Sequence, residues 1–314
     1  MNLEPLTISD AVGGARATIL PGLGFNCHSF RASVDGREIE VLWSAPEFTS
    51  GQGKPSHSGI PLLFPFAGRI RGTSFQYEGN RYELEAGDGQ GNAIHGFVLN
   101  RPWRVTRHDP DRVVGTFQAS VDDPALMKRW PADFRITADY RVAAGALLTD
   151  YTVENPDTKP LPFGFGTHPY FRVPLGGASA ADCRVTAPVE YAWELEDLLP
   201  TGRTTSMPAA AELAHGMSLA SMKLDNVFGG LRFENHRATT KVTDPNSKRT
   251  MTMTFDDQFT TCVVYNPPHR EAVCIEPYTT VPDPFFLGER NIDPHLQVLR
   301  PGKSFRTRIE IRLE

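Results

Sequence analysis

This chain of 314 residues lacks the features of membrane, disulfide-rich and nucleic-acid-binding proteins. It has no long apolar run, so no segment is predicted to span a membrane. The start, MNLEPLTISD, has neither the basic residues nor the apolar stretch of a signal peptide. Only four cysteines occur, without a C-x-x-C pair, which favours reduced thiols in a cytoplasmic protein. The 37 acidic and 32 basic residues form no block of like charge, so neither nucleic acid nor an anionic membrane is an expected partner.

Several catalytic and cofactor-binding motifs are also missing. The sequence contains no H-E-x-x-H, no H-x-H and no cysteine–histidine cluster, so we expect no metal site. It contains neither a phosphate-binding G-x-x-x-x-G-K-[ST] loop nor a G-x-S-x-G nucleophile elbow. The early glycine pairs lack the strand-to-helix context of a dinucleotide-binding loop.

Short runs that alternate apolar and polar residues are frequent instead. Residues 136–142, 251–255 and 309–313 each alternate with a period of two, which is typical of half-buried strands. Gly79-Asn80 predicts a tight hairpin turn, and residues 244–247 (DPNS) predict a second turn.

Helical patterns are few. Asp123-Pro124 predicts the start of a short helix over 125–130, and residues 209–222 could hold some helix, interrupted by Gly216. Many short strands with few helices predict an all-β protein, a β-sandwich or barrel. With 40% hydrophobic residues and an even pattern throughout, we expect one large domain over residues 1–314.

Two ionisable residues stand in similar places, each directly after a strand-like run and directly before a proline. They are His168 in LPFGFGTHPYF and Glu276 in AVCIEPY. The prolines favour extended backbone and are expected to end the strands there, leaving the side chains free to face a cleft. From this placement alone, the commoner interpretations are a histidine bonded to a backbone carbonyl and a salt-bridged or solvated glutamate at a strand end.

Three further candidates are weaker. His95 precedes Gly96, whose missing side chain would let a ligand approach, although a simple turn is the commoner meaning. Arg69 and Arg71 follow an apolar run that ends near Phe66, so one could reach a site and the other water. Asp225 lies in LDNVF, where an Asx turn is the ordinary interpretation.

Taken in order, these segments resemble the aldose 1-epimerase (galactose mutarotase) family, from about Leu20 to the C-terminus. The matching segments are residues 59–72, 92–96, 167–171, 224–228 and 275–277 with Pro282. The resemblance implies a large antiparallel β-sandwich, the galactose mutarotase-like supersandwich, with a sugar in a cleft on a concave sheet. It also implies an isomerase that needs no cofactor or metal, acts on a monosaccharide and is a monomer or homodimer.

The same resemblance implies roles for five residues. His168 corresponds to the general acid and Glu276 to the general base that open the sugar ring. His95, Arg69 and Asp225 correspond to residues that bind sugar hydroxyls or help to polarise the ring oxygen. The nearby carboxylate is expected to raise the pKa of the histidine.

The identity of the sugar stays open. Phe97 after His95-Gly96, and Arg172 close after His168, depart from the pattern of galactose-specific members. The main prediction is a mutarotase of a free aldose. One alternative is a related enzyme for a sugar phosphate or acidic sugar, with Arg69, Arg71 and Arg172 at the cleft. Another is a β-sandwich that binds carbohydrate without catalysis.

Overall fold

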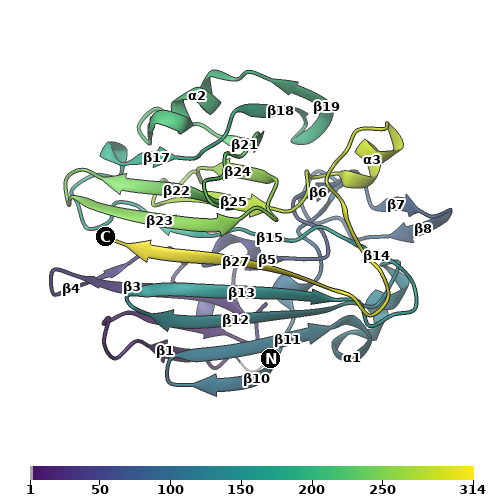
Figure 1. Cartoon of the computed structure of the whole chain (residues 1–314), viewed down its shortest axis with the longest axis horizontal. Coiled ribbons are helices and arrows are strands. Elements are labelled where there is room, and N and C mark those ends of the chain that lie inside the picture. The colour runs from purple at the N-terminus through teal and green to yellow at the C-terminus, as the bar shows by residue number, and fades with distance from the viewer. Residues whose placement is uncertain (1–2) are drawn as a thin grey trace.

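Two large antiparallel β-sheets make up most of the structure, a computed structural model that describes residues 3–314 (Figure 1). The first has nine strands in the order β10 (Arg104–Asp109), β11 (Arg112–Gln118), β12 (Arg135–Ala143), β13 (Ala146–Glu154), β27 (Ser304–Leu313), β23 (Arg249–Asp256), β22 (Arg237–Asp244), β17 (Arg184–Thr186) and β20 (Met217–Ser218). The second has eight strands: β19 (Leu199–Thr205), β18 (Tyr191–Glu196), β21 (Asp225–Gly229), β24 (Thr261–Tyr265), β25 (Ala272–Tyr278), β15 (Gly166–Thr167) and β5 (Leu62–Leu63) in order, with β16 (Tyr170–Arg172) also on β25.

Smaller sheets and helices complete the chain. A four-stranded sheet contains β1 (Leu6–Ser9), β2 (Arg16–Leu20), β3 (Asn26–Val34) and β4 (Arg37–Glu40). Two-stranded sheets pair β14 (Leu161–Phe163) with β26 (Gln297–Leu299), β6 (Arg69–Ile70) with β9 (Ala93–Ile94), and β7 (Ser74–Tyr77) with β8 (Asn80–Glu83). The α-helices are α1 (Ala119–Asp122), α2 (Pro208–His215) and α3 (Pro284–Glu289), and 3-10 turns cover Phe48–Ser50, Pro55–His57, Val98–Asn100, Pro124–Lys128 and Ala180–Asp182.

The prediction of an all-β antiparallel sandwich is confirmed, and so are the three alternating strands, which lie within β12, β23 and β27. In β23 the alternate side chains from Met251 to Phe255 are buried, as a strand with one face on the core requires. The turn at 244–247 is also confirmed, because the Asp244 carboxylate accepts hydrogen bonds from the backbone of Asn246 and Ser247.

The remaining local predictions need adjustment. The hairpin turn lies one residue earlier than expected: Glu78 and Gly79 have the positive φ values, 49° and 77°, and Asn80 already begins β8. The helix expected over 125–130 is a 3-10 turn over Pro124–Lys128. Helix α2 ends as predicted before Gly216, whose φ of 105° closes it.

A buried apolar core lies between the two large sheets. It takes Met253 and Ile309 from the nine-stranded sheet and Val264, Val273 and Ile275 from the eight-stranded sheet. One continuous cluster of buried side chains runs from Ile8 to Leu313. This cluster is consistent with a single domain over residues 1–314. The single domain stays a prediction, and residues 1–2 lie outside the described part of the chain.

The strands of the eight-stranded sheet turn their alternate residues away from this core. Along β25, Ile275 points into the core, whereas Cys274, Glu276 and Tyr278 share the opposite face. This outer face carries the candidate site. No helix within residues 3–314 is long and apolar enough to cross a membrane, and the four cysteines are free and buried.

Candidate active site

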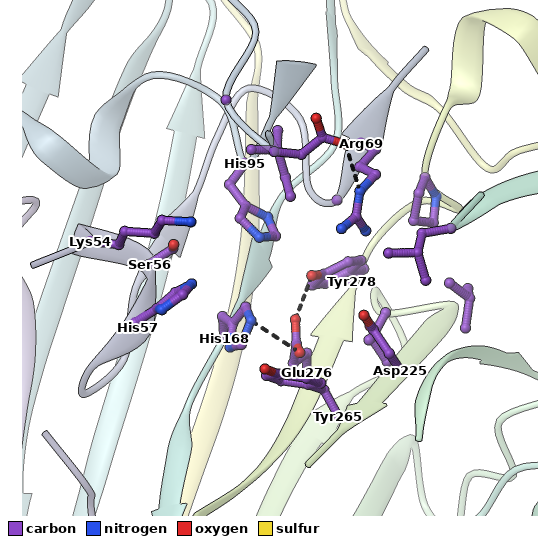
Figure 2. Close-up of a pocket in the computed structure, with 18 of the residues that line it drawn as sticks. Lys54, Ser56, His57, Arg69, His95, His168, Asp225, Tyr265, Glu276 and Tyr278 are labelled. Atoms are coloured by element: carbon purple, nitrogen blue, oxygen red, sulfur yellow. Dashed lines mark hydrogen bonds and ion pairs between the residues drawn. The ribbon is translucent and has the colours of Figure 1, made fainter. Parts of the chain in front are cut away.

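A cleft of about 170 Å³ lies over the outer face of the eight-stranded sheet, and all five predicted site residues line it. His168, Asp225 and Glu276 come from the sheet side, Arg69 comes from β6, and His95 directly follows β9 (Figure 2). Segments more than 200 residues apart in the sequence therefore meet at one place.

Sheet register sets the two central residues opposite one another. Gly166 pairs with Tyr278, and Tyr170 pairs with Cys274, so the shared register places residue 168 across from residue 276. His168 lies between the short strands β15 and β16, and its backbone N–H donates to the Pro61 carbonyl at 3.1 Å. The His168 Nε2 atom lies 3.3 Å from Oε1 of Glu276.

The strand around Glu276 differs from the prediction. Pro277 was expected to end the strand, but β25 continues through it to Tyr278. It does so because β24 keeps pairing on one side, with Cys262 opposite Pro277 and Thr261 opposite Tyr278. Glu276 is thus held inside a strand, with backbone support on both sides of it.

Burial dominates the electrostatics of this pair. His168 is 7% exposed and Glu276 only 1%. Burial lowers the pKa of His168 to about 3 and raises the pKa of Glu276 well above its usual value. The expectation that the carboxylate would raise the pKa of the histidine is therefore wrong for the free cleft. There the favoured state has a neutral His168 ring and a protonated, uncharged Glu276.

Tyr278 supports Glu276 and was missed in the sequence. Its hydroxyl donates to Oε2 of Glu276 at 2.5 Å, and this bond lowers the pKa of Glu276 against the larger effect of burial. The period of two along a strand would have placed Tyr278 on the same face as Glu276. It was overlooked because the strand was expected to end at Pro277.

His168 is held between aromatic rings. It stacks on Tyr170 with ring centroids 4.9 Å apart and planes within 5° of parallel. The His95 ring meets it edge-on at 5.5 Å. Burial, and then the nearby His168 and Arg69, lower the pKa of His95 well below its usual value, so His95 faces the cleft as a neutral imidazole.

The two charged residues at the rim are placed differently. Arg69 donates from Nε to Asp88 at 3.1 Å, and no partner for its terminal nitrogens occurs within residues 3–314. Burial alone would raise the pKa of Asp88, but hydrogen bonds from Asn92, Gln90 and Arg69 lower it to about 2, so its charge fixes the arginine. Asp225 begins β21 rather than forming an isolated turn, and burial raises the pKa of its carboxyl group.

Two arginines that were candidates for an acidic sugar lie elsewhere. Arg71 pairs with Asp283 at 3.2 Å and covers the Phe286 ring at 4.0 Å. Arg172 faces a separate groove beside Glu40. Of the three proposed arginines only Arg69 lines the cleft, because Arg172 lies four residues beyond His168 along the chain, at the groove beside Glu40.

One set of side chains within residues 3–314 has the spacing of metal ligands. His168, Cys274 and Glu276 each place a ligand atom within 4.8 Å of the others. The sequence showed no cysteine–histidine cluster because these residues become neighbours only across the strands. Burial raises the pKa of the Cys274 thiol well above its usual value, which opposes the proton loss that metal binding requires.

Comparisons with known proteins agree with the observed fold. The family model described as aldose 1-epimerase matches residues 13–312. An uncharacterised protein of Escherichia coli K12, YphB, is 24% identical over 295 residues, which cover 90% of this chain and 94% of YphB. A galactose mutarotase-like protein from Clostridium acetobutylicum has a similar fold, with a TM-score of 0.86, 23% identity and coverage of 98% of this chain and 95% of its own. Galactose 1-epimerase from Lactobacillus acidophilus NCFM has a TM-score of 0.73 at 18% identity, covering 100% of this chain and 99% of its own.

Proposed function

Since this chain belongs to the aldose 1-epimerase family, we propose that it is a cofactor-independent isomerase that interconverts the α and β anomers of an aldose. The observation that carries this proposal is the buried pair on the cleft floor, with His168 Nε2 3.3 Å from Glu276 Oε1. A base and an acid at this separation can reach the anomeric hydroxyl and the ring oxygen of one sugar, which are bonded to the same carbon.

The proposed reaction needs one proton shared by the pair. Glu276 removes the proton from the anomeric hydroxyl while His168 gives a proton to the ring oxygen, and the C1–ring-oxygen bond breaks. The open aldehyde turns about C1–C2. Glu276 then returns a proton to the carbonyl oxygen, His168 takes the proton from the C5 hydroxyl, and the ring closes with C1 inverted.

Burial suits this exchange of roles. The free cleft favours the uncharged pair, in which Glu276 holds the proton. Sugar hydroxyls that donate to the carboxylate, together with the positive charge of Arg69, stabilise the ionised form that begins ring opening. The two states then lie close in energy, so the proton can move to either group.

The rim residues are proposed to bind the sugar. Arg69 presents donors held in place by Asp88, and His95 adds a neutral ring whose Nδ1 atom is buried without a partner within residues 3–314. Asp225 contributes a carboxyl group to the cleft, on the side of Glu276 away from His168 (Figure 2). Sugar hydroxyls both donate and accept, and this mixed set suits them.

Saturation-transfer NMR on a panel of aldoses tests the proposal. We expect the purified protein to accelerate anomer exchange of at least one aldose, and His168→Ala to lower that rate by about 10²–10⁴-fold. Sugar binding with no acceleration by the wild-type protein would instead identify a non-catalytic carbohydrate-binding protein. A cytoplasmic location, and a monomer or homodimer, stay predictions that fractionation and sedimentation would check.

A further inference from the structure

One wall of the cleft is basic and is not used by the proposed reaction. It consists of Lys54 and of Ser56 and His57 in the 3-10 turn Pro55–His57, and all three side chains line the cleft. We call these three residues the basic wall. Lys54 and His57 are exposed, and neither side chain has an ion-pair or hydrogen-bond partner in the described chain, residues 3–314.

The positive charge of this wall is not neutralised locally. Partial burial of the His57 ring, and then the positive charge of Lys54 and of His269, lower the pKa of His57. No carboxylate is among the groups that shift the pKa of His57. Of the carboxylates that line the cleft, Asp88 is bound to Arg69, and Glu276 and Asp225 lie beyond His168 (Figure 2). An anion at the wall would relieve this repulsion and accept hydrogen bonds from all three side chains.

Sugar geometry indicates which anion would reach the wall. The ring oxygen of an aldopyranose is bonded to C1 on one side and to C5 on the other. With the C1 hydroxyl at Glu276 and the ring oxygen at His168, C5 and its C6 substituent lie on the side of His168 away from Glu276. Figure 2 shows the basic wall on that side.

We propose that the substrate is an aldose with an anionic group at C6, a uronate or a 6-phosphate, and that the basic wall binds this group. This inference rests on the proposed anomer exchange, which orients the ring. It replaces Arg71 and Arg172 by Lys54, Ser56 and His57 as the residues that recognise an acidic sugar.

The test compares anomer-exchange rates for glucose, glucuronate and glucose 6-phosphate. We expect kcat/KM to be higher for at least one of the two anionic sugars than for glucose. The Lys54→Met variant is expected to lower this anionic-to-neutral ratio by about tenfold, the effect of one charge-assisted hydrogen bond. Lys303→Met removes the same charge from an exposed turn outside the cleft and is expected to leave the ratio unchanged.

Each outcome decides a separate point. Preference for the uronate over the 6-phosphate, or the reverse, identifies the source of the anion. Glucose exchange at least as fast as that of both anionic sugars, or equal ratios in Lys54→Met and Lys303→Met, would overturn the anion site and leave the proposed function standing.

If none of these three sugars is exchanged faster than in buffer, the panel of aldoses decides whether the proposed function is wrong. Calorimetric binding of glucuronate and glucose 6-phosphate then decides the anion site by itself. Tighter binding of either anionic sugar than of glucose, lost in Lys54→Met, would support the site, and equal binding of all three would overturn it.

Discussion

Replacing Glu276 by glutamine should stop proton transfer while leaving the cleft in place. The glutamine oxygen can still accept the hydrogen bond that the Tyr278 hydroxyl now donates at 2.5 Å. The amide nitrogen can donate to Nε2 of His168, which lies 3.3 Å from the present carboxylate. What is lost is a group that binds and releases a proton.

The expected size of the effect follows from that loss. Removing one positioned acid–base group typically lowers a rate by about 10²–10⁴-fold, which corresponds to roughly 3–5 kcal/mol of transition-state stabilisation. Because Glu276 is 1% exposed, its replacement by a neutral isostere removes a buried ionisable group, and the free energy of unfolding is not expected to fall.

Anomer exchange measured by saturation-transfer NMR, with thermal unfolding of the same samples, checks both expectations. Glu212→Gln is the matched control, since Glu212 is exposed on α2 and outside the cleft. In the double variant His168→Ala/Glu276→Gln we expect little further loss beyond either single change, because the pair acts as a unit. A folded Glu276→Gln protein within about threefold of the wild-type rate, far less than one acid–base group contributes, would refute the proposed role.

Three other predictions follow from the site and its supports. Tyr278→Phe removes a hydrogen bond that lowers the pKa of Glu276, so the alkaline limb of the profile of kcat/KM against pH is expected to move to higher pH. An alkaline limb at the wild-type pH would contradict this role of Tyr278. The pair is active while it holds one shared proton, that is, between the pKa of His168, about 3, and the raised pKa of Glu276. Therefore kcat/KM should not fall as the pH decreases from neutrality to about 5. A fall with a midpoint near the ordinary histidine pKa of about 6.5 would contradict a shared proton. Gly96→Ala would place a Cβ atom 2.1 Å from the Phe64 carbonyl oxygen, so it should lower the free energy of unfolding by about 1–3 kcal/mol more than Gly79→Ala. Gly79 is the control because it has a similar φ and open space around it. Equal denaturation midpoints of the two variants would contradict the clash.

The strands of the sheets could be predicted from sequence because they depend on local patterns. Alternation over 251–255 and 309–313 needs only one buried face, and the structure has one. His168 and Glu276 stood out by their positions next to prolines, but only the ordered family resemblance raised them above ordinary strand-end residues. The pattern was misleading at Pro277, where pairing with β24 carries the strand past a residue that usually ends one.

The partners of the site residues and the basic wall could not be predicted, because they depend on contacts between distant segments. Asp88 lies in a loop without periodicity, and its role as the partner of Arg69 appears only when both segments fold over the sheet. Lys54, Ser56 and His57 likewise have no motif of their own. The shift in the pKa of His168 depends on burial, which the residue type and its neighbours in sequence do not reveal.

The floor and the basic wall of the cleft have different constraints. On the floor, sheet register fixes His168 opposite Glu276, and Gly166 leaves room for the Tyr278 ring, since a Cβ there would lie 2.4 Å from it. A substitution on the floor therefore disturbs pairing, packing and proton transfer together. The basic wall, in contrast, is carried by a 3-10 turn, and the side chains of Lys54 and His57 have no ion-pair or hydrogen-bond partner to lose within residues 3–314. Residues of the basic wall can therefore change without disturbing the pairing and packing of the floor, so the same proton transfer can serve sugars that differ in the group this wall contacts.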